Sequence, residues 1–184
     1  MTIVSCTSDN TIRVWDISSG KELFQLTGHT ISVLSLAMLP NEWLASGSKD
    51  KTIKLWDLDQ KKEVDTLKGH LEAVKSLKWH LVSFSENDSM KIWNPILKKS
   101  RLLRTIEAHG NASFAVTLFG VLLNDSLVTC SHDTNFEGVL MVHDPSSGKK
   151  TKSIPTGQRY ALSMLVLSND QVAISQTIKM WKLA

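Results

Sequence analysis

The sequence predicts an all-β protein built from consecutive units of about 40 residues, and three observations carry that prediction. A short motif that ends in tryptophan recurs, because Trp15, Trp56 and Trp93 are separated by 41 and 37 residues. The residues before each tryptophan alternate between apolar and polar side chains, which is typical of a β-strand. No segment of the 184 residues carries a helical period. A repeat of this length indicates an array of similar supersecondary units.

The recurring motif is a turn followed by an alternating strand. Three copies, such as Lys-Asp-Lys-Thr-Ile-Lys-Leu-Trp-Asp, and the second half of a fourth occur at 8–16, 49–57, 86–94 and 177–181. In the copy that ends at Trp56, the side chains of Ile53 and Leu55 point to one face of the strand and Trp56 points to the other. Both faces of this strand are therefore expected to be buried.

Each unit reads as four short strands separated by turn residues. In the best-defined unit we expect these strands near 32–37, 43–48, 52–57 and 62–67. One such sheet is too small to hide its apolar faces, so neighbouring sheets must pack against it. We expect three full units, a first unit without its first strand and a last unit without its fourth, about 18 strands in all. One domain over 1–184 would then hold units at roughly 1–27, 28–68, 69–107, 108–156 and 157–184.

The ends of the units resemble those of the WD-repeat family. Gly28-His29 opens the unit that closes with Trp56-Asp57, and Gly69-His70 opens the unit that closes with Trp93-Asn94. The resemblance implies a β-propeller, partial or irregular here, whose blades each hold four antiparallel strands. It also implies a non-catalytic scaffold or adaptor that binds other proteins or peptides and needs no cofactor.

The resemblance further implies a buried polar chain in each blade that joins a histidine, a strand hydroxyl, a turn aspartate and the tryptophan. The fullest set is His29, Ser46 (or Ser48), Asp50 and Trp56. The other sets are incomplete: Asp9 and Trp15; His70, Ser83, Asn87 and Trp93; His109, Thr129 and Asp133 with His143 in the Trp position; and Gln158 with Trp181. We expect the later blades to be less regular for this reason.

The same resemblance implies that a partner binds to the face formed by the loops between blades and by the turns between second and third strands. The candidate docking residues on that face are Ile31, Lys49, Glu72, Glu86, His132, Arg159 and Tyr160. Their mixed charges and two apolar side chains suit a polypeptide with anchor contacts better than a nucleic acid. We therefore expect protein partners.

The two incomplete units leave three alternatives open. The chain is a fragment or shortened product of a larger propeller, an irregular ring of four to five blades, or an open arc closed by a second copy. An open arc would expose strand edges and an apolar blade face, and self-association would follow.

Composition and charge argue against several other classes of protein. The net charge of +3 is too small for a dedicated nucleic-acid binder. An alternative function, binding of phosphorylated or nucleic-acid ligands, rests on a basic outer patch of Lys98, Lys99, Arg101, Arg104, Lys149, Lys150 and Lys152. No apolar run approaches the ~20 residues of a membrane-spanning helix, so we expect no membrane contact. Two isolated cysteines favour the cytoplasm, with the nucleus as the second choice.

The histidines do not indicate an enzyme. His29, His70 and His109 recur at one point of the period, which a structural role explains and a single active site does not. His132-Asp133 and His143-Asp144 coincide with structural positions of the repeat, and no Gly-rich phosphate loop is present. We expect no catalytic residue and no bound metal.

Overall fold

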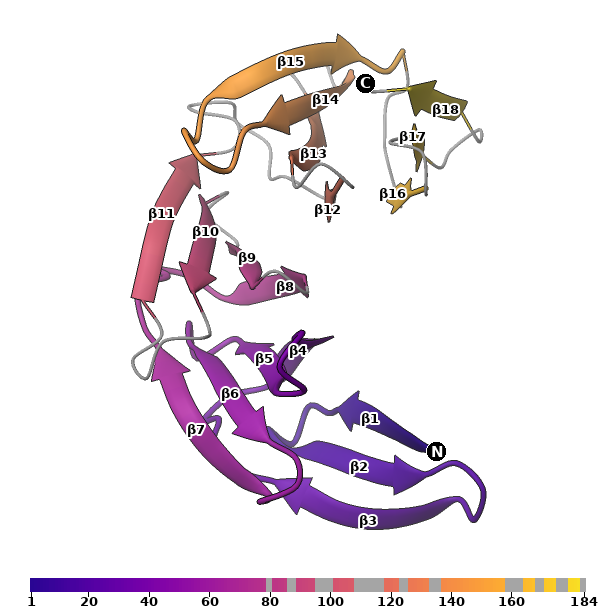
Figure 1. The fold of residues 1–184 in the computed structure, drawn as a ribbon, viewed down its shortest axis with the longest axis vertical. Coiled ribbons are helices and arrows are strands. Elements are labelled where there is room, and N and C mark those ends of the chain that lie inside the picture. The colour runs from indigo at the N-terminus through magenta and orange to yellow at the C-terminus, as the bar shows by residue number, and fades with distance from the viewer. Residues whose placement is uncertain are drawn as a thin grey trace. The chain divides into compact units, whose positions relative to one another are not determined.

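The protein is described by a computed structural model that covers residues 1–78, 81–85, 89–94, 101–107, 118–122, 126–132, 137–157, 164–167, 171–174 and 179–182. Within those ranges the chain forms 18 strands and no helix. The strands make five antiparallel sheets of three, four, four, four and three strands, and each sheet contains only consecutive strands (Figure 1). The predicted all-β class and the predicted set of three full and two incomplete units are thereby confirmed.

The chain divides into two compact units, Met1–Thr105 and Ile106–Ala184, and each is considered by itself. The first unit holds three sheets, of which the last ends with a strand that crosses the boundary. Their strands are β1 (Thr2–Cys6), β2 (Ile12–Asp16) and β3 (Lys21–Leu26); β4 (Val33–Met38), β5 (Leu44–Ser48), β6 (Ile53–Asp57) and β7 (Lys62–Leu67); and β8 (Val74–Lys78), β9 (Val82–Ser85), β10 (Ser89–Asn94) and β11 (Arg101–Glu107).

The second unit holds the remaining two sheets. Their strands are β12 (Leu118–Val121), β13 (Leu127–His132), β14 (Gly138–His143) and β15 (Lys150–Pro155); and β16 (Met164–Val166), β17 (Gln171–Ile174) and β18 (Lys179–Lys182). The expectation of one continuous domain over 1–184 stays a prediction.

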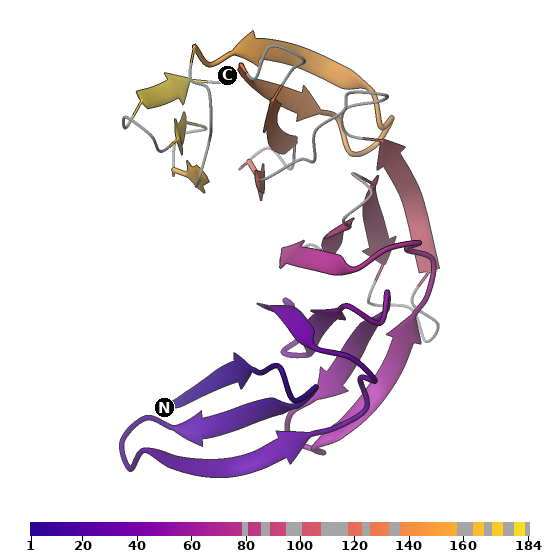
Figure 2. The ribbon, with the colours of Figure 1, turned by 180° about the vertical axis from the view of Figure 1, so that it is seen from behind.

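Packing between sheets, rather than within one sheet, makes the core. In the first unit β4 contacts both β1 and β8, so the second sheet lies between the first and the third (Figure 2). In the second unit β12 contacts β16 in the same way. Each full sheet of the first unit therefore covers an apolar face of its neighbour.

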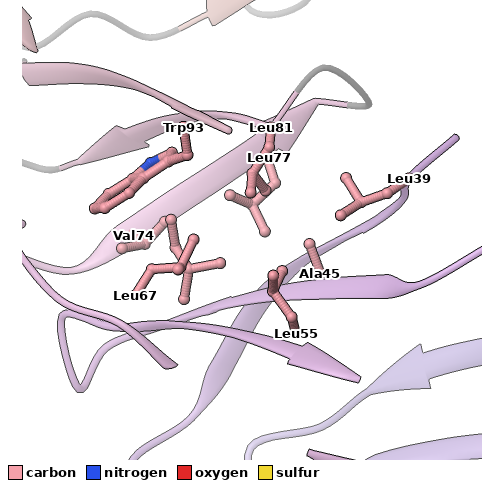
Figure 3. Packing of buried hydrophobic residues seen from close by; sticks show 9 residues of the cluster. Leu39, Ala45, Leu55, Leu67, Val74, Leu77, Leu81 and Trp93 are labelled. Atoms are coloured by element: carbon pink, nitrogen blue, oxygen red, sulfur yellow. The ribbon is translucent and has the colours of Figure 1, made fainter. Parts of the chain in front are cut away.

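The side chains of β6 illustrate how both faces of a sheet become buried. Ile53 and Leu55 belong to an apolar cluster that also contains Val74, Leu77 and Trp93 of the third sheet (Figure 3). Trp56 belongs to a different cluster, together with residues of the first sheet. The predicted alternation of β6 is thus confirmed, and Trp56 and Trp93 each pack toward the preceding sheet.

One irregularity recurs at the same place in three sheets. The register between the strand that carries Trp15, Trp56 or His143 and the strand that follows it shifts just before that residue. A bulge of this kind bends the strand and re-aims the side chain beside it. The shared bulge identifies His143 as the structural counterpart of the tryptophans.

Gly47 lies where β5 of the second sheet contacts β8 of the third. A Cβ built there would lie 2.7 Å from Val74 Cγ1 and 2.6 Å from Ser35 Oγ, well inside van der Waals contact. Because the Ser35 hydroxyl can rotate away while Val74 is held in the core, Val74 sets the limit. The absence of a side chain at position 47 lets β8 approach β5.

We predict that Gly47→Ala lowers the free energy of unfolding by about 1–3 kcal/mol, the usual cost of overpacking a core. Val74→Ala makes room for the new methyl group, so the double variant should lose less than the sum of the two single variants. Urea unfolding of all three measures this coupling. Additive losses would show that Val74 does not limit the space for a side chain at position 47.

Candidate functional site

The second sheet contains a complete chain of buried polar contacts. The indole Nε1–H of Trp56 donates to Ser46 Oγ at 2.8 Å, and the same oxygen lies 2.7 Å from His29 Nε2. On the other side of the ring, His29 Nδ1 lies 2.7 Å from Asp50 Oδ2. The pattern is satisfied when Ser46 donates its hydroxyl proton to Nε2 and the ring donates Nδ1–H to Asp50. A neutral imidazole therefore fills every role in the chain.

The electrostatics of this chain favour the same arrangement. Burial lowers the pKa of His29, although its hydrogen bond to Asp50 acts in the opposite direction. Burial would raise the pKa of Asp50, but hydrogen bonds from Thr52, His29 and the Thr30 amide hold that pKa below its ordinary value. Asp50 is therefore an anion beside a neutral ring.

Ser46 and Ser48, which sequence reasoning left as alternatives, have different partners. Ser46 joins the ring and the indole, whereas Ser48 Oγ donates to the Ile31 carbonyl at 2.9 Å and accepts from the Asp50 amide at 3.0 Å. Ser46 connects the core, and Ser48 fixes the loop that precedes β4.

The third sheet repeats the inner part of this chain, and none of its described residues places a carboxylate beside the histidine. Trp93 Nε1–H donates to Ser83 Oγ at 2.8 Å, and His70 Nε2 lies 2.5 Å from the same oxygen. His70 Nδ1 has Ser89 Oγ at 3.4 Å. Burial and the charge of Lys91 lower the pKa of His70 to about 4. Asn87, which was assigned to this network from the sequence, lies outside the described residues.

The first sheet brings the predicted residues into two separate contacts. Trp15 Nε1–H donates to Ser5 Oγ at 2.8 Å. Asp9 instead accepts from Arg13 Nη2 at 2.7 Å and from Thr11, which lowers its pKa well below the ordinary range. Sequence reasoning missed Arg13, although a cation two residues before the tryptophan recurs as Lys54 and Lys91.

The described residues of the second unit include only parts of the network. Thr129 Oγ1 lies 3.4 Å from His143 Nε2, and His143 Nδ1 is buried without a hydrogen-bond partner among the described residues. In the last sheet Ile174 pairs with Lys179, the register position that Ser46 and Thr129 hold in theirs. The strand hydroxyl is therefore missing there. His109 and Asp133 lie outside the described residues, and nothing is described of the Trp181 side chain.

Three of the seven predicted docking residues lie on one described surface of the first unit. This surface, the loop face, consists of the turns 8–10 and 49–51 and the interblade loops 28–32 and 69–72. Ile31, Lys49 and Glu72 are exposed on it. Glu86, Arg159 and Tyr160 lie outside the described residues, and the side chain of His132 is not described.

Hydrogen bonds tie the segments of the loop face together. Asn10 Nδ2 donates to the Thr30 carbonyl at 3.2 Å, and the Lys49 amide donates to the Ser32 carbonyl at 3.0 Å. Lys51 Nζ reaches Glu72 Oε1 at 3.3 Å, which joins the second turn to the second loop. The backbone of this surface is therefore fixed before a partner arrives.

Sequence reasoning missed Leu71, the most exposed apolar side chain of the loop face. Leu71 is 71% exposed and Ile31 is 46% exposed, so two apolar side chains stand among charged ones. The signal was available, because Leu71 directly follows the histidine of Gly69-His70, next to Glu72.

The described residues offer no arrangement for metal chemistry. No group of three or more His, Cys, Asp or Glu side chains in the described ranges is placed to hold a metal ion. Nor do those ranges include a helix with the length and hydropathy needed to span a membrane.

Replacing Ser46 by alanine removes the oxygen that His29 and Trp56 share. We predict a loss of about 2–4 kcal/mol in the free energy of unfolding, because each buried polar group left unpaired costs about 1–3 kcal/mol. Ser5→Ala removes the acceptor of Trp15 alone, at a less buried site, and should cost about 1 kcal/mol. Urea unfolding compares the two variants. Equal losses would contradict a shared, fully paired network in the second sheet.

His70 makes the stability of the fold depend on pH. The folded pKa of about 4 lies below the ordinary value of 6.5, so the unfolded chain binds a proton there first as the pH falls. The free energy of unfolding should therefore have its highest value above pH 6.5 and decrease by about 3 kcal/mol as the pH approaches 4. Chemical unfolding of wild type and His70→Gln between pH 7 and pH 4 tests this: the variant should show a flatter profile, and an unchanged slope would be the contrary result.

Comparison with known proteins agrees with this geometry. A family model described as "WD domain, G-beta repeat" matches residues 1–16, 20–57 and 61–94, which hold the first two sheets and three of the four strands of the third. A search among curated proteins gives no match. Proteins built from these repeats are in general non-catalytic scaffolds that bind other proteins. With the recurring sheets and their tryptophan positions, the three matches show that the chain belongs to the WD-repeat family.

Proposed function

We propose that the chain is a non-catalytic scaffold or adaptor whose loop face binds a segment of another protein. The observation that carries this proposal is the pair of exposed apolar side chains, Ile31 and Leu71, on a surface whose backbone is held by hydrogen bonds. A few apolar anchors surrounded by polar groups typically supply most of the affinity of a protein interface. A preordered backbone adds to that affinity because less conformational entropy is lost on binding.

The charges of the loop face favour a polypeptide as the partner. Lys51 and Glu72 pair with each other, and Lys49 lies beside them, so the surface presents both signs of charge. A nucleic acid would require a uniformly basic surface. A peptide with one apolar residue for each anchor and a polar backbone fits better.

The histidines support a structural role over catalysis. His29 and His70 are buried, and each faces a serine hydroxyl that is also bound to a tryptophan. A general base must reach a substrate, and these rings are enclosed in the sheet packing. We propose on this basis that the chain is not an enzyme.

We also propose the cytoplasm, or secondarily the nucleus, as its location. Cys6 and Cys130 are not joined in a disulfide, and burial raises the pKa of the Cys130 thiol to about 11. Cysteines outside disulfides are typical of reducing compartments. Microscopy of the chain tagged with a fluorescent protein tests the location.

The docking proposal predicts that Ile31→Glu combined with Leu71→Glu abolishes partner capture. Proteins retained from a cell lysate by wild type should fall at least tenfold with the double variant, since two apolar anchors contribute more than about 1.4 kcal/mol together. Quantitative mass spectrometry of the retained proteins measures the change. Val64→Glu, which changes an exposed apolar residue on the outer strand β7, is the matched control and should retain them.

Salt separates this proposal from binding to phosphate groups. Capture through apolar anchors should persist in 0.5 M salt, whereas binding to phosphates weakens steeply as ionic strength rises. Retained proteins that disappear at high salt, or that are unaffected by the double variant, would contradict the proposal.

A further inference from the structure

A groove lies at the ends of the strands opposite to the loop face. It has a volume of about 460 Å³ and lies between the first two sheets, next to the turns 39–43 and 57–61. Its apolar lining includes Leu23 and Phe24 of β3 and Met38 and Trp43 of the second sheet. Leu23 and Met38 are each about half exposed. We call this feature the interblade groove; its volume is in the range of sites for small ligands or a few peptide side chains.

The rim of the interblade groove is acidic. Glu42, Asp57 and Asp59 belong to its lining, and none of the described lining residues is Lys, Arg or His. The chain as a whole carries a net charge of +3, so this region departs from the general balance. The groove therefore favours an occupant that is positively charged and partly apolar.

Among three described equivalent turns, only that of the second sheet carries a second carboxylate. Asp16 accepts from Ser18 and Ser19, and Asp144 accepts in the same way from Ser146 and Ser147. Those bonds occupy both oxygens of each carboxylate.

In the turn of the second sheet, Asp59 and Gln60 replace the two serines. Gln60 donates its backbone N–H to Asp57 Oδ1 at 2.8 Å, and the described residues provide no donor for Oδ2. The substitution thus adds one carboxylate and leaves another with free acceptor capacity at the groove.

A lysine side chain of the protein already contacts the aromatic lining of the groove. Lys61 Nζ lies 4.9 Å from the centroid of the Phe24 ring, within the range of a cation–π contact. Lys61 is exposed, so an incoming cation can replace it at that ring without disturbing the core.

We propose that the interblade groove binds the arginine side chain of a basic peptide, at a site separate from the loop face. A planar guanidinium stacks on an aromatic ring and forms paired hydrogen bonds with carboxylates, which matches Phe24 beside Asp57 and Asp59. An apolar residue next to the arginine contacts Leu23 and Met38. The site does not depend on the docking proposal, because its residues lie at the other ends of the strands.

A displayed library of random dodecapeptides, selected on the full 184-residue chain, tests the proposal. The enriched peptides should contain arginine beside an apolar residue. Replacing that arginine by citrulline, its neutral isostere, should weaken binding at least tenfold in fluorescence anisotropy. An enriched pool without arginine, or no enrichment at all, would overturn the proposal.

The protein variants follow from the turn comparison. Asp59→Ser restores the Asp-x-Ser sequence of the other two turns, so the fold should be kept while the affinity for the arginine peptide falls about fivefold. Leu23→Ser added to it should extend the loss beyond tenfold. Glu137→Gln, which removes one exposed carboxylate of the second unit, is the matched control and should leave binding unchanged.

Two outcomes would refute the site as stated. Equal affinity of wild type and Asp59→Ser would show that the carboxylates do not take part. If sedimentation shows that wild type self-associates and Asp59→Ser does not, the occupant is a second copy of this chain rather than a basic peptide.

Discussion

Each sheet of this protein depends on its neighbour to cover an apolar face. A sheet of three or four short strands has two such faces and too few residues to form a core of its own. The side chains of β6 show the consequence, because Ile53 and Leu55 pack toward the third sheet while Trp56 packs toward the first. Stability therefore depends on the contacts between sheets. At Gly47 such a contact depends on the absence of one Cβ atom.

The polar network gives this packing a defined geometry, but burying polar groups costs free energy. Only complete hydrogen-bond pairing offsets that cost. In the second sheet Asp50, His29, Ser46 and Trp56 satisfy one another, so burying them leaves no group unpaired. The third sheet lacks a described carboxylate, and the pKa of its histidine falls to about 4. In the fourth, His143 keeps a buried ring nitrogen without a partner among the described residues. The described networks of the third and fourth sheets are thus less complete than that of the second, and the matches to the family model end at residue 94, within the third sheet.

The two ends of the strands in the first unit have different surface chemistry. The loop face combines paired charges with the apolar side chains of Ile31 and Leu71. The interblade groove combines an aromatic lining with Asp59, a carboxylate that the described equivalent turns of the first and fourth sheets lack. One structural unit can in this way present two unlike surfaces, because the turns contribute little to the packing of the sheets and are free to vary.

By itself the sequence determined the strands, their order and the face on which Trp56 lies, because alternation and a repeat period are local properties of the amino-acid sequence. It left Ser46 and Ser48 undecided, since residues two apart point to the same side of a strand and only the neighbouring loop distinguishes them. The pairing of Arg13 with Asp9, four residues away, depends on the fold of the turn before β2. The exposure of Leu71 and the groove between β3 and the turns of the second sheet were decided by tertiary structure. The groove arises where segments distant in sequence meet, and its geometry depends on how closely two sheets pack.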